Sequence, residues 1–214
     1  MITLAIGAYS RFPIPVTVTL MVAPPEYKGR PAKSIQSIDT SHRYYLYEKV
    51  GEGAWAKVRR GLDTHLSPVA IKIYYRCVVE RRLHGGLARL RSEYDMMSAV
   101  PRHPNIVGYL DWAEDGDKVY VVLEWCSMGS VAEWMDRKVE GSVDLPGIRT
   151  ILLDTAAGLR HIHRHGIAHH DIKPGNLLLA SDGHGRIADF GGAERFDSRG
   201  HCGSAFGTPA YQAP

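Results

Sequence analysis

The chain has 214 residues, 44% of them hydrophobic, and a formal net charge of +3. This apolar content argues against wholesale disorder, and the weak charge, without a long Lys/Arg block, argues against nucleic-acid and membrane-surface binding. Cys77, Cys126 and Cys202 are widely spaced, so we predict no disulfide framework and expect a reducing compartment, the cytoplasm or the nucleus.

Residues 1–43 are expected to be a poorly structured leader. Prolines interrupt the apolar run 12–25, whereas a membrane-spanning helix needs about 20 largely uninterrupted apolar residues. A secretory signal is the weaker alternative, because it needs a basic segment before the apolar run and Arg11 is the only basic residue there. We therefore predict no membrane span.

β-like runs with polar or glycine-containing boundaries dominate the chain from about Tyr44 to Glu124. Strands are predicted at residues 45–50, 57–61, 68–74, 105–110 and 118–124. A basic connector is predicted over residues 76–86. After it, apolar residues at helical spacing predict one amphipathic helix that ends before Pro101, namely Leu87, Leu90, Tyr94 and Met97.

The second half changes from strands to helices. A helix is predicted over residues 130–138, and a longer one begins near Pro146, which suits a first helical turn. Its apolar stripe is Ile148, Ile151, Leu152, Thr155, Leu159 and Ile162. After Gly166 the chain reads as loops and very short strands. We therefore predict an α+β fold of two lobes, a β-rich lobe at 44–124 and a helical lobe at 125–214.

Residues 51–58 (GEGAWAKV) place a glycine turn between two predicted strands. Glycines let backbone N–H groups approach phosphate oxygens without side-chain obstruction. An ordinary hairpin turn is the simpler interpretation of this motif alone.

Lys72 lies in the middle of the apolar run 68–74, where an ammonium is costly unless it meets an anion. A nucleotide phosphate is one candidate, and Glu93 on the following predicted helix is the other. We favour an ion pair between Lys72 and Glu93 over a lysine that snorkels at a strand edge.

Two later motifs supply further polar groups. Residues 169–176 (HHDIKPGN) hold Asp171, Lys173 and Asn176, which can orient a hydroxyl, neutralise a phosphoryl group and bind a hard cation respectively. Residues 189–191 (DFG) add the carboxylate of Asp189 as a second cation ligand. A structural loop of capping residues is the alternative, but it does not explain Lys173.

In this order, and together with residues 103–107 (HPNIV) and 207–214 (GTPAYQAP), these motifs resemble the eukaryotic protein kinase family. The resemblance covers about residues 44–214. It implies transfer of the γ-phosphoryl group of ATP, with Mg²⁺, to Ser/Thr hydroxyls of a protein substrate. Lys173 resembles the lysine of serine/threonine kinases.

The resemblance also implies a role for each matching residue. The catalytic set would be Asp171 as base, Lys173, Lys72, Glu93 and Thr208. Asn176 and Asp189 would hold Mg²⁺. The nucleotide would contact Gly51, Glu52, Gly53, Val58, Ala70, Lys72, Leu123, Glu124, Cys126 and Leu178, with Leu123 as gatekeeper and residues 124–126 as hinge.

Three features depart from the family pattern. Ala56 replaces the third glycine of the loop. His170 replaces the usual arginine that pairs with a phosphorylated activation loop, so we predict weak dependence on such phosphorylation. After Pro214 the family continues with helices that complete the second lobe, so the chain is expected to be a partial kinase domain with poor phosphotransfer.

A finer resemblance, in residues 169–179, 189–194 and 205–214, is to the tumour-suppressor liver kinase group that phosphorylates AMP-activated protein kinase. It implies activation by a pseudokinase and a scaffold protein. Calcium/calmodulin-kinase-like and Ste20-like groups stay open, as does a binding scaffold of pseudokinase type. We do not expect His161, His163, His165, His169 and His170 to bind zinc, because the first three alternate by two, which spreads them around a helix, and no cysteine lies nearby in the sequence. His169 is expected to pack against Phe190.

Overall fold

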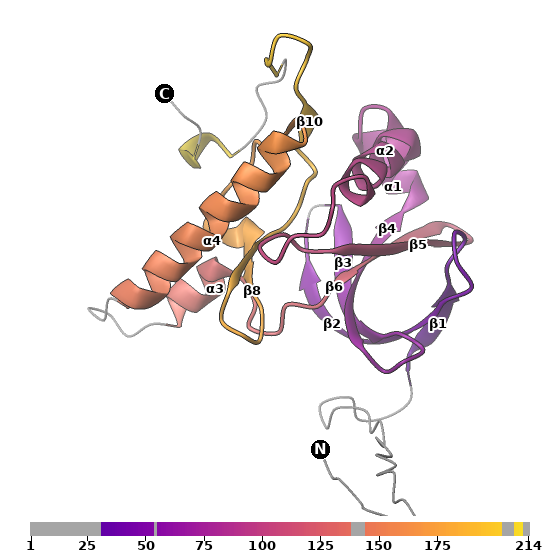
Figure 1. The fold of residues 1–214 in the computed structure, drawn as a ribbon. Coiled ribbons are helices and arrows are strands. Elements are labelled where there is room, and N and C mark those ends of the chain that lie inside the picture. The colour runs from indigo at the N-terminus through magenta and orange to yellow at the C-terminus, as the bar shows by residue number, and fades with distance from the viewer. Residues whose placement is uncertain (1–30, 54, 138–143, 203–207, 212–214) are drawn as a thin grey trace, which may run out of the picture.

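The computed structural model describes residues 31–53, 55–137, 144–202 and 208–211. Figure 1 shows two parts, a curved sheet with two helices beside it and a helical part with short strands. The predicted α+β class with a β-rich first lobe is confirmed. None of the helices in these ranges has the length and apolar character needed to cross a membrane.

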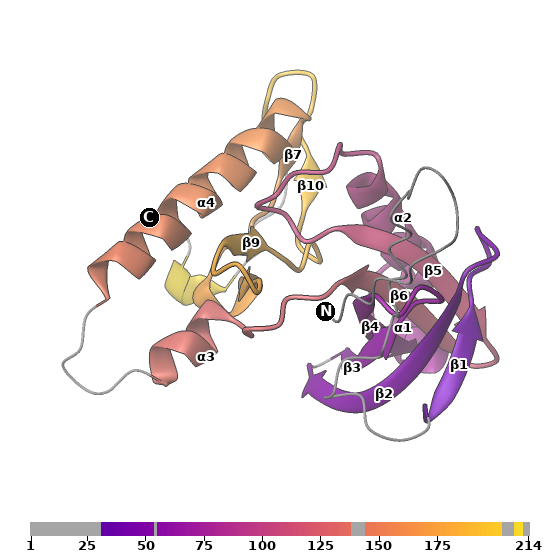
Figure 2. The same cartoon turned by 60° about the horizontal axis from the view of Figure 1, so that its bottom comes forward.

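The sheet of the first lobe has six antiparallel strands in the order β1-β2-β3-β4-β6-β5. They are β1 Lys33–Gln36, β2 Arg43–Glu52, β3 Ala56–Leu62, β4 Pro68–Tyr75, β5 Tyr109–Asp115 and β6 Lys118–Glu124. Side chains alternate across β4. Val69, Ile71 and Ile73 belong to one buried cluster, so Lys72, which lies between Ile71 and Ile73, is on the opposite face of the strand. Figure 2 shows the curvature of the sheet.

The expected leader at 1–43 is wrong for its last part. Residues 1–30 lie outside the described residues, but β1 pairs with β2 through Ser34 and Tyr45. The N–H of Ile38 also donates to the carbonyl of Trp112 at 3.2 Å, which brings the end of β1 to β5. Ile35 is 4% exposed, so burial of this apolar side chain favours the extra strand.

A buried carboxylate holds this segment in place. Asp111 accepts hydrogen bonds from the hydroxyls of Ser37, Thr40 (2.8 Å) and Tyr44 (3.0 Å). Its side chain is only 1% exposed. Because the three donors precede or begin β2, Asp111 ties the start of the described chain to β5.

Asp111→Ala is expected to lower the free energy of unfolding by about 3 kcal/mol, because it leaves the hydroxyls of Ser37 and Tyr44 buried without an acceptor. Denaturant unfolding of the two proteins measures the difference. Asp111→Asn, which keeps one acceptor oxygen, should lose less. A loss below about 0.5 kcal/mol, as for ordinary surface substitutions, would contradict the role given to Asp111.

Two helices follow β4, α1 Arg76–Arg82 and α2 Gly86–Ser98. The expected connector at 76–86 is therefore mostly a short helix, whose Val79 is 1% exposed. The predicted amphipathic helix is confirmed as α2, with Leu90 and Tyr94 buried. They pack against the face of the sheet that carries Lys72, in a cluster that includes Tyr74.

The second lobe holds α3 Val131–Asp136, α4 Leu145–Arg164, β7 Ile167–Ala168, β8 Leu177–Leu179, β9 Gly185–Ile187, β10 Glu194–Arg195 and the 3-10 turns η1 Pro174–Asn176 and η2 Pro209–Tyr211. Both predicted helices are confirmed. The Ser130 and Glu133 side chains form a capping box at α3. Asp144 caps α4, which has Pro146 in its first turn, as predicted.

The predicted strand at 105–110 is misplaced, because β5 begins only at Tyr109. The chain before it pairs with β9 instead: Ile187 N–H donates to the carbonyl of Asn105, and Val107 N–H to that of Ile187, both at 2.9 Å. These residues therefore connect the lobes. Gly158 of α4 allows this close approach, since a Cβ there would lie 2.8 Å from the Asn105 carbonyl oxygen.

The predicted apolar stripe of α4 divides into two parts. Ile151 and Ile162 pack into the core of the second lobe. Leu152 is 64% exposed and Ile148 38%, and Leu145 and Leu153 are exposed beside them. An apolar patch of this kind on one helix face is typical of an interaction surface.

Candidate active site

A pocket of about 500 Å³ lies between the two lobes. Val58 and Ala70 line it from the sheet, and Leu178 lines it from β8. The first lobe also contributes Gly51, Lys72, Leu123 and Glu124, the hinge contributes Cys126, and the second lobe contributes Asn176 and Asp189. The structure therefore brings the residues predicted to contact adenine and cation into one space.

Asp171 lies beside this pocket at the centre of a hydrogen-bond network. Lys173 Nζ lies 2.8 Å from its Oδ2, and the Thr208 hydroxyl donates to its Oδ1 at 2.7 Å. The Thr208 N–H and Asn176 Nδ2 donate to the same carboxylate at 2.9 and 2.8 Å. Burial opposes ionisation, but these hydrogen bonds, led by that of Lys173, lower the pKa of Asp171 to about 2.

Asp171 is consequently an anion at neutral pH, with its orientation set by donors from two segments. Lys173 also donates to the Thr208 hydroxyl at 2.7 Å. Lys173 and Thr208 thus support each other as well as Asp171. Such a fixed carboxylate can accept a hydrogen bond from a hydroxyl and orient it for attack.

Asn176 and Asp189 offer oxygens suited to Mg²⁺. Asn176 turns its Nδ2 to Asp171, and within the described ranges no hydrogen bond reaches its Oδ1. The Ala188 N–H donates to the Asn176 carbonyl at 2.9 Å, which keeps the residue before Asp189 next to Asn176. The Asp189 side chain is 49% exposed. This donor set fits a hard divalent cation.

Lys72 makes its ion pair with Asp189, at 2.9 Å, and not with Glu93. The predicted Lys72–Glu93 pair is therefore wrong for this structure. Asp189 adopts a left-handed backbone conformation, with φ 63°, that an L-residue seldom takes. Burial disfavours the Lys72 ammonium, but the oxygens of Tyr74, Asp189 and Glu93 together raise its pKa above the ordinary value.

Glu93 remains near Lys72 without pairing with it. The site that a Cβ on Gly191 would occupy lies 3.9 Å from both carboxylate oxygens of Glu93, so Glu93 faces the DFG segment. It also lines a second cavity, of about 490 Å³, between α2 and residues 190–195. Burial raises its pKa to about 7, although Lys72 acts in the opposite direction.

In the ligand-free protein, Glu93→Gln is expected to raise the free energy of unfolding relative to the wild type. This gain should be larger at pH 8 than at pH 5 by on the order of 2–3 kcal/mol. The folded-state pKa of about 7 exceeds the ordinary 4.5. The stability that the Glu93 carboxyl group contributes is thus fully present below about pH 4.5 and is lost as the pH rises through 7. Denaturant unfolding at both pH values checks this. Parallel pH dependence in the two proteins would contradict it.

His169 packs behind the loop, as predicted. Its ring lies edge-on to Phe190 with centroids 4.9 Å apart. Nδ1 accepts from the N–H of Asp171 at 3.2 Å, so Nε2 carries the proton that it donates to the Ala188 carbonyl at 3.0 Å. Burial lowers its pKa. Neutral His169 therefore joins the Asp171 loop to the strand before Asp189.

The glycine turn is closed by its own backbone. The Gly53 N–H donates to the carbonyl of Ala56 at 2.8 Å. Glu52 is paired with Lys49, at 2.8 Å, and with Lys57, at 3.8 Å. Of the two glycines, only Gly51 lines the pocket. In this conformation Glu52 and Gly53 do not contribute to the pocket, unlike their predicted role.

At the hinge, Glu124 turns its side chain away from the predicted adenine position. Its carboxylate accepts from Arg186 and from the N–H of Gly108. The Cys126 N–H makes no hydrogen bond in the part of the chain that the structure describes. It is thus available as a backbone donor to a ligand.

Several pocket residues were not expected from the sequence. Arg60 lies over the Trp125 ring at 4.7 Å. Glu133 of α3 and Arg137, the residue that follows this helix, line the pocket beside Met128. The capping-box spacing of Ser130 and Glu133 was the one available signal, and it indicates a helix start without indicating which cavity the helix borders.

Comparison with known proteins gives a consistent result. A family model described as the protein kinase domain matches residues 44–214. The chain is 33% identical over 178 residues to Serine/threonine-protein kinase STK11 of Homo sapiens, which covers 80% of this chain and 40% of that protein. The STK11 of Xenopus laevis matches with the same identity and coverage.

A plant protein is equally similar. CBL-interacting protein kinase 22 of Oryza sativa subsp. japonica is 33% identical over 201 residues, covering 80% of this chain and 42% of that kinase. The chain thus spans about two fifths of the length of these relatives. Their equal identities do not distinguish one kinase subgroup from another.

Proposed function

Because the chain belongs to the protein kinase family, as serine/threonine-type relatives indicate, we propose that it transfers the γ-phosphoryl group of ATP to serine or threonine hydroxyls of a protein substrate. The observation that carries this proposal is the Asp171 carboxylate. Lys173, Asn176 and Thr208 orient it beside a pocket that contains Lys72 and Asp189.

The chain's own groups divide the work of such a transfer. Asp171 would accept the hydrogen bond of the attacking hydroxyl and receive its proton. Lys173, between Asp171 and Thr208, would neutralise charge on the transferred group. Asn176 Oδ1 and the Asp189 carboxylate would hold Mg²⁺, which when bound neutralises and aligns the phosphate oxygens of ATP.

The purine would occupy the apolar part of the pocket. Val58 and Ala70 lie on one side of it and Leu178 on the other, while the Cys126 N–H offers a hydrogen bond. Lys72 would exchange its ion pair with Asp189 for the phosphates, and Glu93 would complete the charge balance. This requires a shift from the arrangement that the structure shows.

Transfer of radiolabelled phosphate from ATP with Mg²⁺ to a generic protein substrate tests the proposal, with identification of the labelled amino acid. Phosphoserine or phosphothreonine is expected. Thermal stabilisation by MgATP without any transfer, also after extension of the second lobe with helices of a relative, would instead favour the second candidate, a nucleotide-binding scaffold. The unpaired arrangement of Lys72 and Glu93 is what favours that candidate.

We also propose activation by protein partners, an activating pseudokinase and a scaffold, in place of loop phosphorylation. His170, at the position of the family's phosphate-binding arginine, is the reason. Ser198→Glu is therefore expected to change transfer by less than about threefold, and Ser204→Glu likewise, although Ser204 lies outside the described residues. Activity assays of each variant with and without a phosphatase test this. An increase of orders of magnitude would overturn it.

A further inference from the structure

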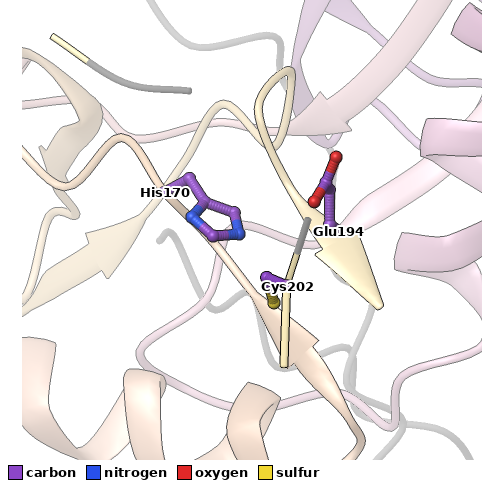
Figure 3. A group of neighbouring side chains, drawn as sticks. All are labelled: His170, Glu194 and Cys202. Atoms are coloured by element: carbon purple, nitrogen blue, oxygen red, sulfur yellow. The ribbon is translucent and has the colours of Figure 1, made fainter. Parts of the chain in front are cut away.

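Three side chains with metal-binding atoms meet where the catalytic loop approaches the activation segment. His170, Glu194 and Cys202 each contribute one ligand atom, and these atoms lie within 4.8 Å of one another. Figure 3 shows the imidazole, the carboxylate and the thiol around one shared space. None of the three lines the pocket between the lobes.

The fold brings these residues together from separate segments. β10 pairs with β7 through Glu194 and Ala168, so Glu194 lies next to the start of the loop that contains His170. The turn after β10 is closed by hydrogen bonds between Asp197 and His201, with Asp197 N–H donating to the His201 carbonyl at 2.8 Å. That turn returns the chain and places Cys202 opposite Glu194.

His170 has the features of a ligand without its ion. Its Nε2 is buried, and among the described residues nothing forms a hydrogen bond with it. Its backbone has φ 64°, a left-handed conformation that is strained for a histidine. A buried imidazole nitrogen without a partner is costly, and coordination to a cation would remove that cost.

Contrary to the expectation from the sequence that His170 binds no zinc, we propose that His170, Glu194 and Cys202 bind one zinc ion, which attaches the activation segment to the catalytic loop. Nitrogen, carboxylate and thiolate are the ligands zinc prefers, with water in the fourth position. Their atoms would approach by about 1 Å, since ligand atoms on one zinc lie roughly 3.3–3.8 Å apart. The Cys202 thiol would release its proton to solvent as the zinc–sulfur bond forms.

Charge favours a cation here over a phosphate. With Cys202 as thiolate, the three ligands carry two negative charges, which one divalent ion balances. The Glu194 carboxylate and the Cys202 sulfur would repel a phosphorylated side chain at the same place. The metal would therefore substitute for the phosphate that orders this segment in kinases with arginine at position 170.

The test titrates the full chain with Zn²⁺ alone, in competition with a chromophoric chelator, and with Co²⁺ as a spectroscopic probe. One tight site and a thiolate-to-cobalt charge-transfer band are expected. Cys202→Ser should abolish the band and weaken Zn²⁺ binding by more than the roughly 10–100-fold that loss of an outer-shell partner costs. His170→Asn, which tolerates the left-handed backbone, and Glu194→Gln should also weaken it.

Two controls make the result specific. Cys77→Ser removes an exposed thiol on α1 and should leave binding and band unchanged. His161→Ala removes the imidazole of α4 that packs against the rings of His103 and His165, a second group of histidines able to attract zinc, and should leave the tight site intact. Binding that survives Cys202→Ser, or that is lost with His161→Ala, would overturn the proposal.

The test of the metal site is independent of the proposed phosphotransfer, because zinc binding and the cobalt spectrum are measured without a kinase assay. Its effect on activity rests on the proposed function. A chain that binds zinc through Cys202 but transfers no phosphate would contradict only the proposed function. A chain that transfers phosphate but binds no zinc would contradict only the metal site.

Discussion

Asp171→Asn is expected to lower phosphoryl transfer by about 10²–10⁴-fold, the range typical for loss of a positioned acid–base group. The amide matches the carboxylate in shape but cannot receive the proton of the attacking hydroxyl. It also deprives Lys173 and Thr208 of a charged acceptor. Affinity for MgATP should change little, because Asp171 does not line the pocket.

Steady-state transfer rates and nucleotide titrations of both proteins separate these effects. Asp136→Asn, an exposed aspartate at the end of α3, is the matched control and should retain full activity. The pKa of about 2 adds a second signature: the wild-type rate should not fall between pH 7 and pH 5 through protonation of Asp171. Undiminished transfer by Asp171→Asn would show that this carboxylate is not the base.

Lys72→Met is expected to lower transfer by roughly 10²–10³-fold, the usual cost of removing one preorganised donor at a site of developing charge. Methionine keeps much of the volume of the side chain but removes the ammonium. Stability without ligand should change little. The partner left behind, Asp189, is 49% exposed and remains solvated.

Transfer assays at saturating ATP and thermal unfolding without ATP measure the two effects. Lys49→Met, on an exposed lysine of β2, serves as the control. Full activity of Lys72→Met would refute the assignment of Lys72 to the phosphates. A large loss of stability without nucleotide would show instead that Lys72 is mainly a structural residue.

The sequence predicted those parts of the fold and site that depend on interactions between residues close together in the chain. The β-like run 68–74 predicted the strand that the structure shows as β4, with Lys72 in its middle. Pro146 indicated the first turn of α4, and residues 169–176 form one compact loop. In each case the sequence distance between the interacting groups is short.

Contacts between distant segments were not predictable in this way. Two acidic residues, Glu93 and Asp189, lie near Lys72. Lys72 pairs with Asp189, whose left-handed backbone conformation cannot be read from the sequence. β1 was missed because its anchor, Asp111, is more than 70 residues further on. Likewise, His170, Glu194 and Cys202 come together only through the β7–β10 pairing and the turn between Asp197 and His201.

The most direct measurement of the central claim is a crystal structure with a non-hydrolysable ATP analogue and Mn²⁺ in place of Mg²⁺. We expect an anomalous peak between Asn176 Oδ1 and the Asp189 carboxylate, with Lys72 on the phosphates and Asp171 facing the terminal one. A metal or nucleotide bound outside the pocket between the lobes would contradict it.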